Sequence, residues 1–128
     1  MPDAACMGAR SEPGVALVSA SRLTALDAEP LGVGGGAVHR TTWTDGRSSA
    51  GVMHIDAGHH LGEHTHRRHH HHVWVVTGST RVLGEDLPAG SYAHIPAGVE
   101  HDFEAVGDEG CTVFYLYLEQ GQEGPATD

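Results

Sequence analysis

Residues Gly58 to Gly78, which read GHHLGEHTHRRHHHHVWVVTG, are the stretch that decides the fold of this chain. The stretch holds eight of the chain's 12 histidines and ends in a β-rich valine and tryptophan run. His64 and His66 are separated by one residue, and on an extended backbone such residues point the same way, with Cα atoms roughly 6.5–7 Å apart. Two imidazoles so placed can bind one metal ion through nitrogens at ~2.0–2.1 Å. The stretch therefore predicts metal ligands that lead directly into a strand.

Short apolar runs alternate with glycine and proline turns on both sides of this stretch. We expect strands at residues 15–18, 38–44, 49–55, 73–77, 81–83, 91–95, 101–106 and 111–119, with a hairpin turn at Asp45-Gly46. Residues 21–27 read as a turn or one helical turn, and residues 31–37 as a loop or a loose edge. Because no long helix is predicted, the pattern is typical of an all-β sandwich or barrel.

The length of 128 residues indicates a single domain with a sizeable core. We expect a flexible N-terminus at residues 1–14, one β-domain at residues 15–119 and a flexible polar tail at residues 120–128. The two cysteines, Cys6 and Cys111, lie far apart, so a disulfide framework is not expected and a cytoplasmic setting is the default.

The charge of the chain excludes two classes of partner. Its net charge is −10 with histidine neutral, and Arg67-Arg68 is the only basic pair. A nucleic acid or an anionic membrane would require a basic stripe, so neither is expected, and no apolar run reaches the length that spans a bilayer. The sequence contains no lysine, which rules out chemistry through a lysine base or a Schiff base.

A second constellation follows downstream in the segment GSYAHIPAGVEH, which contains Gly90, Pro96, Gly98 and His101. The pattern predicts a strand, a turn fixed by proline and a returning strand that begins with a histidine. Such a turn can direct His101 into the space between two sheets.

With both constellations in place, the chain resembles the cupin superfamily. The first cupin motif, G(x5)HxH(x3–4)E(x6)G, is matched by Gly58, His64, His66 and Gly78, with His71 in the place of the glutamate. The second motif, G(x5)PxG(x2)H(x3)N, is matched by the four residues named above, and Ala105 replaces the asparagine. The strand pattern extends the resemblance over about residues 38–119.

The resemblance implies a cupin-type double-stranded β-helix, or jelly-roll barrel, that forms a homodimer and binds a metal through His64, His66, His71 and His101. Fe, Mn or Zn would be the ion, with Ni or Cu as further candidates, because four neutral imidazoles favour borderline transition metals over Mg or Ca. Strict alternation from His71 places Val73 and Val75 inside and His70, His72 and Trp74 outside. A register slip of one residue would reverse this arrangement.

For the remaining polar and aromatic residues, the sequence gives weaker indications of a role at the site. His69, His70 and His72 are expected in solvent, and His94 could face either way. Phe103 shares a face with His101 and is expected to wall the pocket, whereas Tyr92, Tyr115 and Tyr117 could line the cavity or serve only packing. Glu63, Glu100, Asp102 and Glu104 alternate with metal ligands and should point away from the metal, so no catalytic side chain is assigned.

Two functions fit these residues. The first is a metal-dependent oxidoreductase of the dioxygenase kind, acting on a small organic substrate that coordinates through oxygen, because chemistry would have to come from the metal. The alternative is a zinc-binding module without turnover that has a sensing or regulatory role, since the chain is also similar to the cupin domain of zinc-dependent anti-sigma factors. The fold alone cannot choose between them.

Overall fold

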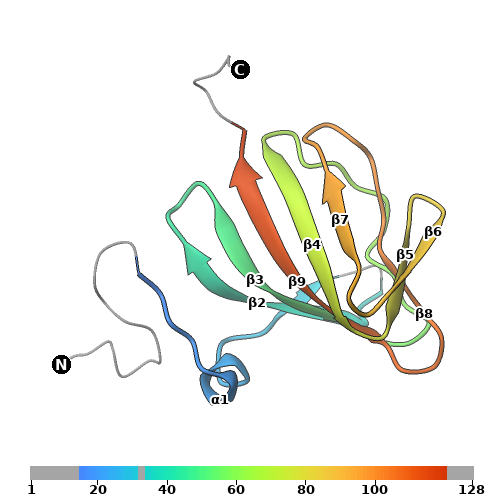
Figure 1. Ribbon diagram of the computed structural model, residues 1–128, viewed down its shortest axis with the longest axis horizontal. Coiled ribbons are helices and arrows are strands. Elements are labelled where there is room, and N and C mark those ends of the chain that lie inside the picture. The colour runs from blue at the N-terminus through green and yellow to red at the C-terminus, as the bar shows by residue number, and fades with distance from the viewer. Residues whose placement is uncertain (1–14, 32–33, 121–128) are drawn as a thin grey trace.

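Nine strands and one short helix make up the described part of the chain in the computed structural model, which covers residues 15–31 and 34–120 (Figure 1). The elements are α1 (Ala20–Leu23), β1 (Glu29–Leu31), β2 (Ala37–Thr44), β3 (Ser49–Ile55), β4 (His69–Thr77), β5 (Ser79–Val82), β6 (Glu85–Pro88), β7 (Tyr92–Ile95), β8 (Glu104–Val106) and β9 (Cys111–Glu119). A six-stranded sheet has the order β1-β2-β3-β9-β4-β7, and a three-stranded sheet has the order β6-β5-β8. All strand pairs are antiparallel, so the all-β jelly-roll prediction is confirmed.

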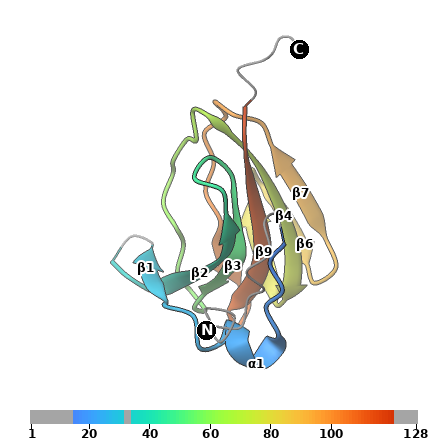
Figure 2. The ribbon, with the colours of Figure 1, turned by 90° about the vertical axis from the view of Figure 1, so that its left-hand side faces the viewer.

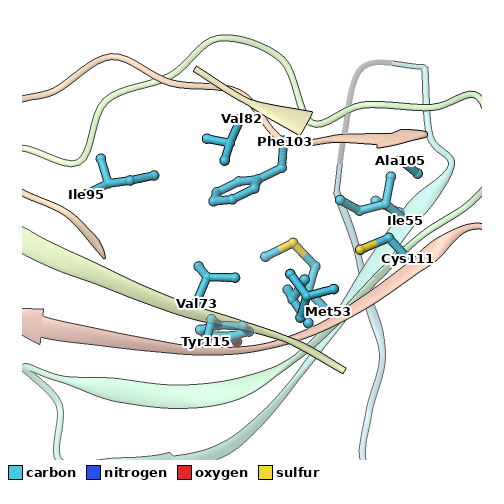
Figure 3. Close-up of a cluster of buried hydrophobic side chains, with 12 residues drawn as sticks. Met53, Ile55, Val73, Val82, Ile95, Phe103, Ala105, Cys111 and Tyr115 are labelled. Atoms are coloured by element: carbon cyan, nitrogen blue, oxygen red, sulfur yellow. The ribbon is translucent and has the colours of Figure 1, made fainter. Parts of the chain in front are cut away.

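The core lies between the two sheets and is filled by their inward-facing side chains (Figure 3). Val73 of β4, Tyr115 of β9 and Met53 of β3 come from the larger sheet, while Val82 of β5 belongs to the smaller one. Phe103, which precedes β8, is 2% exposed and lies beside Val82 in Figure 3. These apolar contacts hold the sheets together and support the histidines described below.

Strand β4 keeps the predicted alternation. His71, Val73 and Val75 are buried, while His72 is half-buried and Trp74 is exposed. The register against β9, with His71 opposite Tyr117, fixes this arrangement along the centre of the sheet. The predicted inward face of the histidine run is therefore confirmed.

Gly78 ends strand β4 at a point where no side chain fits. Its φ is 75°, and a Cβ built there would lie 2.0 Å from the carbonyl oxygen of Gly110. Gly110 in turn has a φ of 78° and packs against the carbonyl oxygen of Ile55. The glycine that closes the first motif is thus required by a close backbone approach.

Several predicted boundaries were wrong. Residues 15–18 form no strand, and instead Ala16 and Val18 line a groove with Trp43 of β2 and Val52 of β3. Of the loop or loose edge expected at 31–37, Leu31 ends the edge strand β1 and Ala37 begins β2, while β6, which follows a tight turn at Gly84, was not predicted. The strand predicted at 101–106 is only β8, since His101 forms an isolated bridge.

Most residues at the two ends of the chain lie outside the part that the structure describes. The flexible N-terminus predicted at residues 1–14 lies outside the described residues, as does the tail predicted at 120–128 apart from Gln120, whose backbone N–H donates to the carbonyl of Arg68 at 2.6 Å. Figure 2 shows α1 at the lower end of the molecule and β1 beside β2. In the part of the chain that the structure describes, no helix has the length and hydropathy needed to cross a bilayer.

Candidate metal centre

Backbone hydrogen bonds join the two motifs across the barrel. His64 and His101 exchange a pair of backbone N–H to carbonyl bonds, each 2.8 Å long. The N–H of Gly98, in the proline turn of the second motif, donates to the carbonyl of His66 at 2.8 Å. The segment before β4 is thereby held against the segment before β8, and histidines separated by 35 or more positions become neighbours.

Three of the predicted ligands converge. His64, His66 and His101 each offer a ring nitrogen, and these nitrogens all lie within 4.8 Å of one another. The ring centroids of His64 and His66 are 4.9 Å apart, and those of His64 and His101 are 4.3 Å apart. Nitrogens each about 2 Å from a common ion lie about 3–4 Å apart, and the 4.8 Å limit brings the three rings near that spacing, so they are candidates to share one cation.

Hydrogen bonds to backbone carbonyls fix the tautomer of two of these rings. Nδ1–H of His64 donates to the carbonyl of Gly62 at 2.7 Å, and Nδ1–H of His101 donates to the carbonyl of Val99 at 2.9 Å. A carbonyl oxygen only accepts, so each Nδ1 carries the proton and the lone pair of the neutral ring lies on Nε2. This arrangement is common in metal-binding histidines, whose second nitrogen is held by an outer partner.

His71 is 1% exposed, as is His101. Its ring centroid is 5.3 Å from that of His66 and 5.6 Å from that of His101, so it borders the group without joining the three nitrogens within 4.8 Å. Tyr117 packs closer, at 4.3 Å, and Phe103 contacts the ring edge-on at 5.4 Å. His64, His66 and His101 thus form one cluster, and His71 lies beside it.

Buried nitrogens of the cluster and of His71 have no hydrogen-bond partner among the described residues. Nε2 of His66, Nε2 of His101 and both nitrogens of His71 are shielded from solvent without a hydrogen bond. A buried polar atom left unpaired costs about 1–3 kcal/mol, so several of them in one place point to a bound species that would satisfy them. The donor set fits a divalent transition metal, because neutral imidazole suits Zn, Cu, Fe and Ni.

Burial keeps these imidazoles neutral. Burial, together with a smaller effect of the neighbouring histidines, lowers the pKa of His66 to about 4 and that of His71 to about 2. Burial also lowers the pKa of His101. A neutral ring is the form that can donate a lone pair to a metal, so the cluster is ready to bind a cation at neutral pH.

A cavity of about 310 Å³ opens beside the cluster. Leu31, Met53 and Leu61 give it an apolar wall, and His64 and His66 form the side toward the cluster. Tyr117 and Glu63 also line it. Glu63, which was expected to point away from the metal, is exposed and lies in a bend before His64 rather than in a regular strand.

The other residues singled out in the sequence have structural roles. Phe103 packs on the rings of His71 and His101, at 5.4 and 5.6 Å, but it does not line the cavity beside the cluster. The Tyr115 hydroxyl lies 3.0 Å from Nδ1 of His39, and Tyr92 is exposed. Asp102, predicted to point away from the metal, accepts the N–H of Gly62 at 2.7 Å and so supports the loop that carries His64.

The outer face of β4 carries a separate group of histidines. His72 stacks on His94 of β7 with centroids 4.6 Å apart and planes 6° apart, which settles the open orientation of His94 toward the outside. The Tyr92 hydroxyl lies 2.6 Å from Nδ1 of His72, and the N–H of Ala97 donates to Nδ1 of His70 at 3.2 Å. These histidines have partners and stay apart from the cluster inside.

Comparison with solved structures shows the same fold in proteins of different function. A chain in the Rhodobacter sphaeroides SigE complex with the anti-sigma ChrR has 22% identity and a TM-score of 0.63, covering 72% of this chain and 49% of that one. A predicted oxalate decarboxylase from Thermotoga maritima has 15% identity and a TM-score of 0.65, over 75% and 95% of the two chains. The polyketide cyclase RemF from Streptomyces resistomycificus has 20% identity and a TM-score of 0.64, over 82% and 84%.

At these identities the likeness shows the fold alone, and this chain spans only about half the length of the SigE–ChrR chain that it matches. No curated protein matches the sequence. A family model described as the ChrR cupin-like domain matches residues 16–120, which is most of the chain and nearly all of its described part. This chain therefore belongs to the ChrR cupin-like family of the cupin superfamily.

Proposed function

We propose that this protein is a metal-dependent oxidoreductase of the dioxygenase kind that acts on a small organic molecule coordinating through oxygen. The observation that carries the proposal is a group of histidine nitrogens, several of them buried and unpaired, beside a cavity of about 310 Å³. A site that served folding alone would need no space next to its ligands. The cavity supports a ligand that enters and leaves.

Each histidine has a separate role in this proposal. His64, His66 and His101 would hold the ion, and His71 would complete the set from the core side after a small rearrangement of its ring. The carbonyls of Gly62 and Val99 keep two of the rings in the tautomer that exposes Nε2. When bound, an Fe, Mn or Zn ion, or Ni or Cu, would supply Lewis-acid or redox chemistry that the chain's own side chains lack.

A zinc-binding module with a sensing or regulatory role is the second candidate, and the family match favours it. The matching family model is named for ChrR, and one similar structure is a complex that contains the anti-sigma ChrR. In this candidate the four histidines would bind zinc to stabilise one conformation, and the partner would be another protein. The cavity would then need no occupant.

The setting of the protein is part of the same proposal. A homodimer is inferred from the cupin resemblance, and the exposed aromatic side chains of Trp74 and Tyr92 on the outer sheet face are compatible with a protein contact. A cytoplasmic setting is inferred from the cysteine usage, and Cys111 is free and buried. A small-molecule ligand would be the main partner.

Metal analysis and oxygen uptake test the proposal together. Protein purified without a nickel resin should contain close to one Fe or Mn ion per chain, and His101→Ala should lose most of it, whereas the matched outer variant His94→Ala should keep it. Reconstituted protein should consume oxygen with at least one member of a panel of diketones and catechols. Bound zinc with no oxygen uptake for any reconstituted metal would favour the binding module, and unchanged metal in His101→Ala would reject the site.

A further inference from the structure

The cavity beside the cluster has a chemical character that narrows its ligand. Three of its lining residues, Leu31 of β1, Met53 of β3 and Leu61, are apolar, and they come from separate segments of the chain. No arginine lines the cavity among the described residues, and the chain contains no lysine. A ligand with several negative charges would enter without a counter-ion, in a protein whose net charge is already −10.

Tyr117 gives the cavity one hydrogen-bonding group beside the histidines. Its ring centroid lies 4.8 Å from that of His66 and 4.3 Å from that of His71. Its register partner on β4 is His71, so the strand pair β4–β9 fixes the position of both rings. Within residues 15–31 and 34–120, no hydrogen bond occupies the Tyr117 hydroxyl, which leaves it available to a ligand.

Glu63 places a negative charge at the entrance. It is exposed, yet it lines the cavity and lies near enough to His101 to act on that ring electrostatically. A carboxylate in this position repels small polyanions and tolerates a neutral molecule or one with a single acidic proton. The apolar wall, the Tyr117 hydroxyl and the Glu63 carboxylate therefore all favour a ligand that is largely apolar and carries at most one negative charge.

We propose that the cavity binds a small, largely apolar organic molecule whose polar end carries two oxygens, one directed at the ion held by the histidines and one accepting a hydrogen bond from the Tyr117 hydroxyl. The apolar body lies against Leu31, Met53 and Leu61. Oxalate and other small polyanions are excluded as preferred ligands. This inference rests on the proposed metal site and adds to it the class of molecule and a positioning residue, Tyr117.

A series of hydroxamates tests the inference without any need for turnover. Acetohydroxamate and butanohydroxamate share one two-oxygen polar end and differ by two methylene groups. In cobalt-loaded protein, titration followed by the visible absorption of Co(II) should show that affinity rises roughly four-fold per added methylene, because each buried methylene contributes a similar transfer free energy. Oxalate, measured in parallel, should bind at least ten-fold more weakly than butanohydroxamate.

Two variants separate the apolar wall from the hydroxyl. Leu61→Asn should remove most of the gain from the longer chain and leave acetohydroxamate binding within two-fold of the parent. Tyr117→Phe should weaken both hydroxamates by about five- to ten-fold, since it removes one hydrogen bond, while cobalt content stays unchanged. Circular dichroism of each variant checks that the fold is retained.

The possible results of these titrations separate a failure of the proposed ligand class from a failure of the proposed metal site. If no cobalt spectrum develops, the metal site itself is rejected. If cobalt binds but affinity does not depend on chain length, or if oxalate binds best, the ligand class is overturned while the metal site stands. If Tyr117→Phe binds both hydroxamates as tightly as the parent, the positioning role of Tyr117 is rejected.

Discussion

The two faces of strand β4 use the same residue type for opposite purposes. On the inner face, His71 is 1% exposed, and neither of its ring nitrogens has a hydrogen-bond partner in the part of the chain that the structure describes. On the outer face, His72 stacks on His94 and its Nδ1 lies 2.6 Å from the Tyr92 hydroxyl. The difference shows that the number of histidines in the run carries little information, and that the side of the sheet each one faces decides whether it can bind an ion.

Among single substitutions, the largest loss of stability is expected at Gly78, where the end of β4 packs against the backbone of Gly110. Gly78→Ala would place a Cβ 2.0 Å from the carbonyl oxygen of Gly110 at a φ of 75°. Left-handed strain of about 1–2 kcal/mol adds to overpacking of roughly 1–3 kcal/mol, so the free energy of unfolding should fall by about 2–5 kcal/mol. Chemical denaturation measures it.

Gly84→Ala is the matched control for this change. Gly84 has a φ of 82°, and no atom of residues 15–31 or 34–120 beyond its chain neighbours lies within 4 Å of the Cβ position. Only the backbone strain remains, so the loss should be about 1–2 kcal/mol. Equal losses in the two variants would show that the close approach to Gly110 contributes nothing.

Replacing the inner histidine should separate folding from metal binding. His71→Leu removes two unpaired buried nitrogens and fills the site with an apolar side chain, so the metal-free protein should gain about 1–3 kcal/mol of stability. The same variant should bind zinc more weakly, by at least the roughly 10–100-fold that is typical of losing an outer partner of a ligand. Thermal melts with and without zinc, together with competition against a chelator, measure both effects.

The outer variant His72→Leu should change neither the stability of the metal-free protein nor its zinc affinity by a comparable amount. A metal-free His71→Leu protein that is less stable than the parent would mean that His71 has a partner in the native state. Unchanged zinc affinity would reduce the site to His64, His66 and His101.

Two adjacent valines of β4 test which face of the strand points inward without changing any histidine. Val75 is 3% exposed and Val76 is 53% exposed. Val75→Ala should lower the free energy of unfolding by roughly 1.5–3 kcal/mol through lost burial and a residual cavity, whereas Val76→Ala should stay within about 0.5 kcal/mol. Urea denaturation of the two variants gives the comparison, and similar losses would contradict the observed register.

A separate expected effect is a dependence of stability on pH in the metal-free protein. The pKa values of His66 and His71 are lowered from 6.5 to about 4 and about 2, so below pH 6.5 the unfolded chain binds more protons than the folded one. Their contribution to stability is complete above about pH 6.5 and is lost as the pH falls toward 4 and below. The midpoint of urea unfolding should therefore drop steadily between pH 7 and pH 4.5.

His71→Leu should flatten this dependence, because one titrating group is removed. The change in slope should be at most about 1.4 kcal/mol per pH unit between pH 6 and pH 4. A parent protein with no loss of stability over this range would show that the cluster is not kept neutral by burial. Saturation with zinc should steepen the dependence, since protons then compete with the ion.

The sequence by itself determined the all-β class, the two cupin motifs and the inward face of β4. Motif spacing and two-residue alternation are local properties, so His64, His66, His71 and His101 could be selected before any contact was known. Strands β3 and β9 were predicted with their observed ends for the same reason.

Only the tertiary structure decided how those residues meet. The backbone pair between His64 and His101 brings three nitrogens within 4.8 Å and leaves His71 beside them, and neither result follows from spacing. Glu63 and Tyr117 line the cavity because a bend and a cross-strand register bring them there. Local patterns fix the direction of a side chain within its own strand, whereas distances between segments far apart in the sequence depend on how the whole barrel closes.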